Sequence, residues 1–328
     1  MTAADIARSL GISRATVGFV LNSTPGQAIS AATRERVLAE ASRLGYRPNA
    51  AAQALASGRS RCILILLPDW PVGYTLQRSL DVAVDVLEQG GYWPVVHTYR
   101  RGERARPLWE YINPEVVVCF GLFDAEDLAA IRASGVRKVL PDVSTGPGEP
   151  ELPLITAGPR RQVEHLYDLG HRRLAIATSR DPRPASLIAG RTRAARAAVA
   201  EFGMHLESVV AVDHRDGSAE RAVEAWRAAG VTGVVAYNDT VAAVVLGAVV
   251  RAGLRVPAEL AVVGHDNAPL AELFVPAISS VTVDTDSLAR YLARMALHEA
   301  DGRPAPTEVP DWTAQLFPRE STVAAGGI

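Results

Sequence analysis

The sequence predicts a small all-α headpiece followed by an α/β core made of two doubly wound parallel-sheet lobes. Short helix-like segments with capping residues fill the first 46 positions, and from position 61 onward apolar runs alternate with amphipathic helices. A chain of 328 residues with 48% hydrophobic residues is long enough for two or three domains with buried cores.

The first predicted helix covers residues 3–10. Thr2 can cap its N-terminus, and Asp5 stands three residues later, as in a capping box. Gly11 can adopt the positive φ angle that ends a helix at low cost. We therefore expect a short helix and a tight turn at the start of the chain.

Two more helices are predicted in the headpiece. Ser13 can cap a helix over 14–21, and Ser30 can cap another over 31–44, which Gly45 ends. The apolar residues of the third helix are expected to face inward: Val37, Leu38, Ala41 and Leu44. Short helices joined by a Gly-centred turn are typical of the helix-turn-helix motif, and the alternative is a generic small helical bundle.

The charge of the chain is distributed unevenly. Residues 1–60 hold seven arginines against three carboxylates, a charge of +4, whereas the whole chain carries −2. A basic head on an acidic body suggests that the head meets a polyanion such as nucleic acid. A segment of this charge also arises by chance, so the charge alone does not decide the partner.

The segment 47–60 is predicted to be a linker. Residues 49–58 have high helix propensity, but Leu55 is the one large apolar side chain among them. Such a segment is marginal as an isolated helix, and Gly58 makes a flexible joint to the next domain.

The core is predicted to contain buried strands separated by helices. Strand-like runs lie at 62–67, 94–99, 116–120, 137–140, 173–177, 209–212, 233–236 and 260–264. Helix-like runs lie at 75–89, 125–134, 160–169, 191–203, 217–229, 240–253 and 286–300. Unbroken apolar strands indicate parallel sheets covered on both faces, and such sheets bind ligands at the carboxyl ends of their strands. We expect an exposed connection at 143–153.

Several observations exclude other classes of protein. Cys62 and Cys119 adjoin apolar runs and are interpreted as small buried hydrophobic residues, not as a disulfide or metal site. The N-terminus lacks an apolar signal region, and no apolar stretch could span a bilayer, so we expect a cytoplasmic protein with no membrane partner. No phosphate-binding loop, nucleophile elbow or metal-ligand spacing is found, so we expect no catalysis, no cofactor and no metal.

Six segments occur in an order and spacing typical of one known family. The head and linker contain DIARSLGISRATVGFVLN and ISAATRERVLAEASRLGYRPNAAAQAL. The core contains HLYDLGHRRLAIAT, AYNDTVAAVVLGAVVRAGLRVPAELAVVGHDN, PAISSV and LFPRESTV. Together these segments resemble the LacI/GalR family of transcription regulators over nearly the whole chain. The resemblance implies a helix-turn-helix headpiece, a hinge helix and a core with the periplasmic-binding-protein-like fold.

The resemblance also implies the limits of the domains. We expect a DNA-binding domain at 1–46, a hinge at 47–60 and an effector-binding and dimerisation core at 61–328. Within the core, an N-terminal lobe would hold about 61–158 and 284–313, and a C-terminal lobe about 159–283 and 314–328.

The head carries short polar residues at its helix ends, where phosphate oxygens can bind backbone N–H groups and hydroxyls. The family's phosphate contacts match five positions: Thr2, Ser13, Thr16, Asn22 and Thr33. The alternative for each is a helix cap without a ligand. Arg14 and Ala15 open the recognition helix, from which side chains reach base edges; the alternative for Arg14 is a solvated charge.

The recognition helix departs from the family pattern at Gly18 and Phe19, where most relatives have Ser-Arg. Phe19 cannot hydrogen-bond to a base edge but can contact a thymine methyl, and the alternative is a core aromatic. Gly18 weakens the helix by about 1 kcal/mol relative to alanine. We therefore expect an operator preference that differs from the common one.

In this family two hinge helices pair across a dimer and insert a leucine into the minor groove. Leu55 occupies the matching position, with Asn49 and Ala52 upstream on the same segment. An apolar wedge of this kind kinks the duplex at a cost of a few kcal/mol, which extra contacts offset. The alternative is a plain alanine-rich linker.

Five core residues are expected at the effector site. Arg191, Asn238 and Asp266 match the family's effector contacts at the carboxyl ends of strands or the helix starts that follow. Trp70 and Tyr74 follow the first core strand and can stack on a ligand, or else pack within the lobe. Two departures leave the effector unnamed: segment 281–285 lacks an aromatic, and segment 155–159 lacks an aspartate at a strand end.

These features predict a transcription regulator, a repressor by default, that binds a pseudo-palindromic double-stranded DNA operator as a homodimer. A small molecule, a sugar by default, would bind between the lobes and alter hinge order. The rival classes are an enzyme, which the absence of a catalytic constellation disfavours, and a secreted solute receptor, which the added head disfavours.

Overall fold

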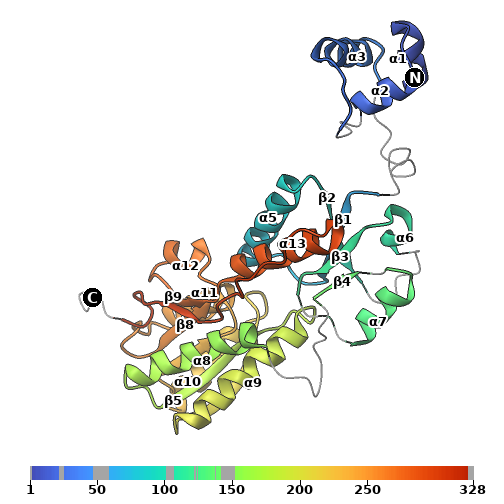
Figure 1. Ribbon diagram of the computed structural model, residues 1–328. Helices are drawn as coiled ribbons and strands as arrows, with labels where there is room; N and C mark the ends of the chain where they lie inside the picture. Colours follow the sequence, from blue (N-terminus) through green and yellow to red (C-terminus); the bar gives the residue numbers. More distant parts are fainter. Residues whose placement is uncertain are drawn as a thin grey trace.

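The computed structural model describes residues 2–21, 26–46, 59–100, 107–121, 123, 125–136, 138–141 and 152–323. It contains a helical headpiece and a two-lobed α/β core (Figure 1), which confirms the predicted fold class.

The headpiece contains three helices, α1 (Ala3–Leu10), α2 (Arg14–Leu21) and α3 (Ala31–Arg43). They bury one apolar cluster that includes Ile6, Val17, Val20 and Val37. Gly11 and Gly45 adopt the positive φ angles expected of helix ends.

One inward residue was wrongly predicted. Leu38 is 50% exposed, whereas Val37 and Ala41 are buried. Val37 and Ala41 stand four positions apart on one helix face, and Leu38 is turned away from that face by the helix period.

The N-terminal lobe is built on a four-stranded parallel sheet in the order β2-β1-β3-β4. Its strands are β1 (Cys62–Pro68), β2 (Trp93–Tyr99), β3 (Val116–Cys119) and β4 (Val139–Leu140). Its own helices are α5 (Tyr74–Gln89), α6 (Leu108–Ile112) and α7 (Ala125–Ala133). Every residue of β1 is buried, as the unbroken apolar run predicted.

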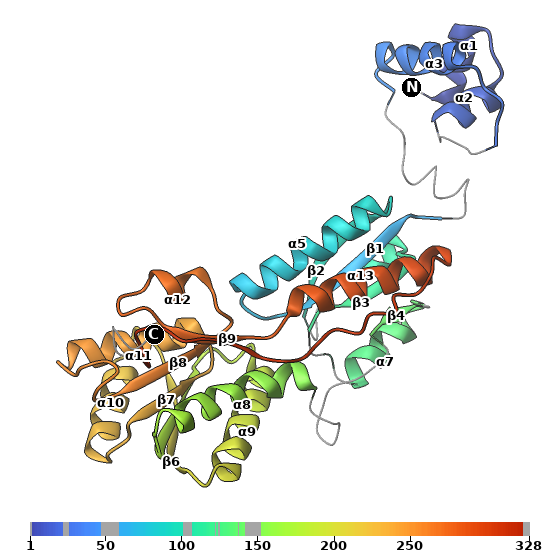
Figure 2. The ribbon, with the colours of Figure 1, turned by 60° about the vertical axis from the view of Figure 1, so that its left-hand side comes forward.

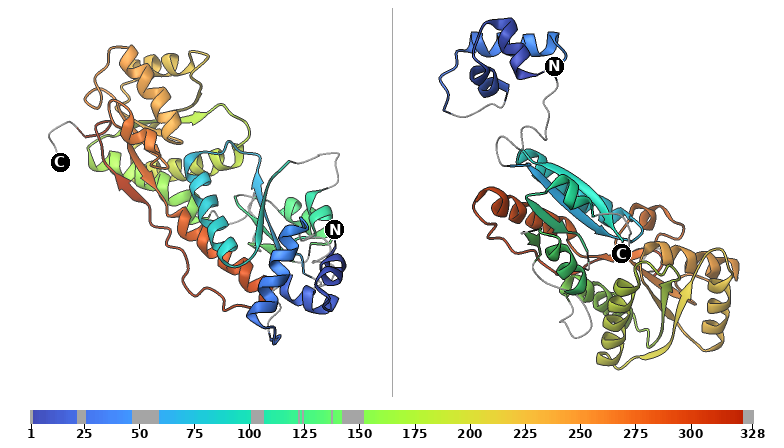
Figure 3. Two further views of the ribbon diagram at one scale, coloured as in Figure 1. Left: turned by 90° about the horizontal axis from the view of Figure 1, so that it is seen from above. Right: turned by 90° about the vertical axis from the view of Figure 1, so that its right-hand side faces the viewer.

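A late helix, α13 (Thr285–Asp301), returns to the N-terminal lobe and runs beside α5 (Figures 2 and 3). These two helices cover one face of the sheet, and α6 and α7 cover the other. The chain therefore crosses between the lobes more than once.

The C-terminal lobe is built on a six-stranded sheet in the order β10-β9-β8-β7-β5-β6. Its strands are β5 (Arg173–Ser179), β6 (His205–Val212), β7 (Gly233–Ala236), β8 (Ala261–His265), β9 (Ser279–Thr282) and β10 (Gln315–Phe317). All pairings are parallel except that of β10 with β9. Its helices are α8 (Pro153–Asp168), α9 (Ala185–Glu201), α10 (Ser218–Ala228), α11 (Asp239–Arg251) and α12 (Pro269–Leu273).

Several elements differ from the prediction. Strands β9 and β10 and helices α6 and α12 were not predicted, because each is five residues or shorter and β9 begins with two buried serines. Strand β6 begins at 205 instead of 209, because this edge strand is only half-buried over its first residues and shows no apolar run there.

Helix α8 also corrects the interpretation of segment 155–159. The family resemblance predicts the end of a strand here, but the segment forms the early turns of α8, which begins at Pro153. Proline is well tolerated at a helix start, because its missing N–H has no partner there in any case. The missing aspartate therefore says nothing about a strand-end site.

Both cysteines are buried free thiols, as expected, and burial raises the pKa of Cys62 to about 11 and that of Cys119 to about 12. No helix in the described part of the chain has the length and hydropathy to cross a membrane.

Candidate DNA interface and effector cleft

Helices α2 and α3 begin with the same arrangement of a serine and a threonine. The Ser13 hydroxyl accepts a hydrogen bond from the Thr16 backbone N–H at 3.0 Å and lies 2.8 Å from the Thr16 hydroxyl. Ser30 and Thr33 repeat the pattern at 3.2 and 2.9 Å. Both serines are exposed. These caps hold hydroxyls at two helix N-termini, where the helix dipole favours an anion.

The start of α1 is closed by a capping box. The carboxylate of Asp5 accepts hydrogen bonds from the backbone N–H of Thr2 at 2.9 Å and from the Thr2 hydroxyl at 3.0 Å. These hydrogen bonds hold the pKa of Asp5 below its ordinary value. The predicted cap is confirmed, and Asn22, the remaining phosphate candidate, lies outside the described residues.

The recognition-helix candidates divide into exposed and half-buried positions. Arg14 and Ala15 are exposed, whereas Gly18 and Phe19 are half-buried. Phe19 does not belong to the buried headpiece cluster, which favours the interpretation as a contact residue over that as a core aromatic. A β-carbon at Gly18 would meet nothing within 4 Å, so a lack of space does not explain glycine there.

The hinge candidates Asn49, Ala52 and Leu55 lie outside the described residues. The first described residue after them, Arg59, is held by the N-terminal lobe. Its guanidinium donates to a carboxylate oxygen of Glu115 at 2.9 Å, to the Tyr92 hydroxyl at 2.5 Å and to the Ala300 carbonyl at 3.0 Å. The backbone N–H two positions later donates to the other oxygen of Glu115 at 2.8 Å. Sequence reasoning missed this anchor, because its partners are far away in the sequence.

The effector candidates Arg191 and Asp266 form one ion pair in the C-terminal lobe. The Arg191 Nη2 atom lies 2.9 Å from Asp266 Oδ1, and its Nη1 donates to the Tyr237 carbonyl at 2.8 Å. The guanidinium also lies over the Tyr237 ring, 5.1 Å from its centroid. Arg191 lies in the second turn of α9, not at its start, because the helix begins at Ala185.

Asp266 is strained and ionised. It follows β8 with a φ of 96°, a conformation that side chains rarely adopt. Burial opposes its ionisation, but the positive charge of Arg191 and a hydrogen bond from His265 outweigh burial and hold its pKa well below the ordinary value. A strained, charged side chain at a strand end is typical of a binding site.

Asn238 and its neighbour Asp239 follow β7. The Asn238 side chain accepts a hydrogen bond from the Val241 N–H at 2.9 Å and so caps α11. Asp239 is buried and accepts from the Ala268 N–H at 2.7 Å and the Ser280 hydroxyl at 2.6 Å. Burial raises the pKa of Asp239 to about 7, despite these hydrogen bonds. This carboxyl ties the loop after Asp266 to β9, a role that the sequence did not reveal.

The N-terminal lobe contributes Trp70 and Tyr74 at the carboxyl end of β1. Trp70 is half-buried near Gly121, and Tyr74 begins α5 with 46% of its surface exposed. Their neighbour Thr75 crosses to the other lobe, where its hydroxyl donates to the Asp266 carbonyl at 3.3 Å. This threonine makes a contact between the lobes that the sequence did not predict.

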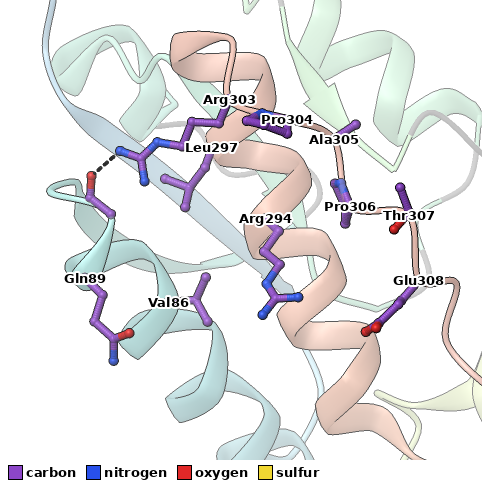
Figure 4. A pocket seen from close by; sticks show the side chains of 11 residues that line it. Val86, Gln89, Arg294, Leu297, Arg303, Pro304, Ala305, Pro306, Thr307 and Glu308 are labelled. Carbon is purple, nitrogen blue, oxygen red and sulfur yellow. Dashed lines mark hydrogen bonds between the residues drawn. The ribbon is translucent and has the colours of Figure 1, made fainter.

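A separate cavity of about 490 Å³ lies on the N-terminal lobe between α5, α13 and segment 303–308 (Figure 4). Arg303 borders it and donates to the Gly90 carbonyl at 2.7 Å, which fastens this segment to the end of α5. None of the predicted effector residues lines it. Those residues lie instead where strands β1, β7 and β8 end, and on the helix α9.

Comparison with known proteins matches the headpiece and the core to two separate families of domains. Residues 2–49 match the bacterial regulatory proteins of the lacI family, and residues 163–322 match the periplasmic binding protein-like domain. The chain is 30% identical to the transcriptional regulator MalR of Streptomyces coelicolor, over 99% of this chain and 97% of that protein. It is 27% identical to the regulator CelR of Thermobifida fusca, over 90% of this chain and 91% of that protein.

Solved structures share the fold. The lac repressor dimer bound to operator and the anti-inducer ONPF has a TM-score of 0.77 at 22% identity, covering 99% of each chain. The CelR–cellobiose complex has a TM-score of 0.64 at 25% identity, covering 98% of this chain and 99% of that one. These relatives are transcription regulators, not enzymes. The chain therefore belongs to the LacI family of DNA-binding transcription regulators, with a helix-turn-helix head and a two-lobed effector-binding core.

Proposed function

We propose that the protein is a repressor that binds a pseudo-palindromic operator as a homodimer and responds to a sugar held between its lobes. The observation that carries this proposal is the combination of two serine-capped helix N-termini in the head with a strained, ionised Asp266 in the core. The first arrangement suits phosphates, and the second suits a hydroxyl-rich ligand.

In the head, the hydroxyl residues are proposed to contact phosphates and the start of α2 to read bases. Arg14 can donate two hydrogen bonds to a guanine, and Ala15 and Phe19 can contact thymine methyl groups. Gly18 allows the helix backbone to approach the groove. The phosphate group comprises Thr2, Ser13, Thr16, Asn22 and Thr33.

The hinge residues Asn49, Ala52 and Leu55 are proposed to order on DNA and to wedge Leu55 into the minor groove. Arg59 supports a role in coupling, because it fastens the end of this hinge to Tyr92, Glu115 and Ala300 of the N-terminal lobe. A movement of that lobe would therefore move the hinge.

The homodimer is supported by exposed apolar side chains on both lobes. Trp93 is 71% exposed and Val96 is 40% exposed on the edge strand β2, while Leu273 and Val275, at the end of α12 and just after it, are 78% and 84% exposed. Patches of this kind are typical of protein interfaces.

The effector is proposed to be uncharged and rich in hydroxyl groups. The charged side chains at the strand ends pair with one another, which leaves little net charge for an anionic or cationic ligand. The pairs are Arg191–Asp266, Arg183–Asp181 and Arg100–Asp69. Planar guanidinium and carboxylate groups suit the vicinal hydroxyls of a sugar, with Asn238, Trp70 and Tyr74 completing the site.

The test is selection of random-sequence duplex DNA by the full-length protein at one fixed salt concentration, since phosphate contacts make affinity depend steeply on salt. We expect enrichment of a two-fold symmetric site. Arg14→Ala should then weaken binding to that site by about tenfold to a hundredfold, because it removes one bidentate base contact. Arg8→Ala, which alters an exposed arginine paired with Asp5 on α1, is the control. Selection of no site above bulk DNA would contradict the proposal.

A further inference from the structure

His265, at the end of β8, lies directly beside the proposed effector contact Asp266. It is 3% exposed, and its Nδ1 atom lies 2.7 Å from Asp266 Oδ1, the oxygen that also pairs with Arg191. Within the described part of the chain, no donor is found for the other carboxylate oxygen, Oδ2. Two donors therefore occupy one oxygen and leave the second for a ligand.

The hydrogen bond defines which nitrogen of His265 carries the proton. Burial and then the charge of Arg191 lower the pKa of His265, so the ring is neutral and has one N–H group. The ionised carboxylate of Asp266 can only accept, so the proton must be on Nδ1. The Nε2 atom is then a lone pair, and it is buried without a hydrogen-bond partner among the described residues.

The far edge of the imidazole is pressed against helix α8. A β-carbon at Gly158 would lie 2.0 Å from His265 Nε2, and its next neighbours would be two other atoms of the same ring. Glycine is therefore required at 158 by the position of this ring. The ring is held between α8 on one edge and Asp266 on the other.

Asp266 needs such support, because its backbone is strained. Its φ is 96°, and the next residue, Asn267, also has a positive φ of 47°. We propose that His265 is a positioning residue of the effector site: braced against Gly158, it fixes Oδ1 of Asp266 so that Oδ2 faces the ligand. This inference rests on the proposed function of Asp266 as an effector contact.

The first test is the nitrogen spectrum of the imidazole groups in full-length protein labelled with ¹⁵N-histidine, recorded without ligand. We expect the signal of a neutral histidine with its proton on Nδ1 that His265→Asn removes, whereas the Nδ1–H signal of His298, which donates to the Arg303 carbonyl, should remain. A neutral His265 with its proton on Nε2 would overturn the proposal, because such a ring cannot donate to Asp266.

The second test measures binding of a sugar probe to matched variants. The probe is the member of a panel of neutral hexoses and disaccharides, cellobiose included, that raises the Tm of the wild type most. His265→Phe keeps an aromatic ring but removes the donor, and should weaken binding by about tenfold to a hundredfold. His265→Asn places an amide N–H near the position of Nδ1 and should bind within about threefold of the wild type.

Gly158→Ala tests the brace itself. It should weaken binding as much as His265→Phe, although alanine suits a helix better than glycine. The His265→Asn background lacks the ring atom that would lie 2.0 Å from the β-carbon, so Gly158→Ala should have a clearly smaller effect there. The proposal would be overturned if Gly158→Ala weakened sugar binding equally in both backgrounds. It would also be overturned if the His265→Asn variant bound the sugar as weakly as the His265→Phe variant.

His171→Phe, at a distant histidine that contacts Thr232, is the control and should bind within about twofold of the wild type. If no sugar in the panel binds, the proposed effector class fails, and the ligand-free spectrum still decides whether His265 holds Asp266.

Discussion

The head and the effector cleft both present polar side chains to a partner, but they arrange them in different ways. In the head, Ser13 pairs with Thr16 and Ser30 pairs with Thr33, each three positions apart. In the cleft, Arg191 pairs with Asp266 across 75 positions, and Thr75 reaches Asp266 across 191. The head is thus organised by local helix capping, whereas the cleft depends on the packing of whole lobes. Substitutions should therefore change the stability of the protein more around Asp266 and Asp239 than in the head.

The largest effect is expected at Gly264, beneath the cleft. A β-carbon there would lie 2.2 Å from Asp239 Oδ1, and that carboxyl is buried and hydrogen-bonded. Gly264→Ala should lower the free energy of unfolding of the core by about 3 kcal/mol or more. All five tryptophans lie outside the head, so tryptophan fluorescence during urea unfolding reports on the core.

The control for this substitution is Gly247→Ala on α11. A β-carbon there would meet only the flexible end of Arg251, at 3.1 Å. We expect at most a small change in stability. Equal losses for the two substitutions would show that Asp239 is not a rigid obstacle.

The second effect is the change of stability with pH, which runs in opposite directions in the core and in the head. The folded-state pKa of Asp239 is raised to about 7, so its contribution to stability is complete below about pH 4 and is lost as pH rises through 7. The loss is of the order of 4 kcal/mol. Asp239→Asn should remove it, so the stability difference between the wild type and the variant should change with pH in tryptophan-monitored unfolding.

In the head, hydrogen bonds from Arg43 and Ser9 lower the pKa of Glu40 to about 2. The contribution of Glu40 to the stability of the headpiece is present above pH 4.5 and is lost as pH falls toward 2. Hydrogen exchange of the headpiece amides should show protection that falls in acid and is insensitive to Asp239→Asn. Loss of headpiece protection between pH 4 and 7 would contradict this division.

The third effect tests the anchor that joins the two regions. Arg59→Glu should weaken binding to the selected DNA site by about tenfold or more, because it removes the pairing with Glu115 and places like charges together. The double variant Arg59→Glu with Glu115→Arg should recover much of that loss. If Arg59 acted only on DNA phosphates, the charge swap would restore nothing.

The smallest effect is expected in the recognition helix. Gly18→Ala fills open space on α2 and should stabilise the headpiece by about 1 kcal/mol, because alanine loses less backbone entropy in a helix. Thermal unfolding of the headpiece, followed by hydrogen exchange, would show the gain. A loss of stability would mean that α2 needs the freedom of glycine.

The sequence alone was sufficient to determine the features that depend on neighbouring residues. The helix caps at Thr2, Ser13 and Ser30, the buried strand β1 and the two-lobed parallel architecture are all visible in local patterns, because capping and hydrophobic periodicity operate over a few positions. The family, too, is recognisable from residue motifs alone, because these are patterns along the chain.

Only the tertiary structure decided how distant groups meet. The exposure of Leu38, the helical state of segment 155–159 and the anchor at Arg59 depend on which surfaces pack together. Asp266, whose pKa is lowered, and Asp239, whose pKa is raised, are both carboxyls that follow strands, and the sequence does not distinguish them. Their pKa values diverge because Arg191 and His265 contact the first, whereas burial dominates at the second.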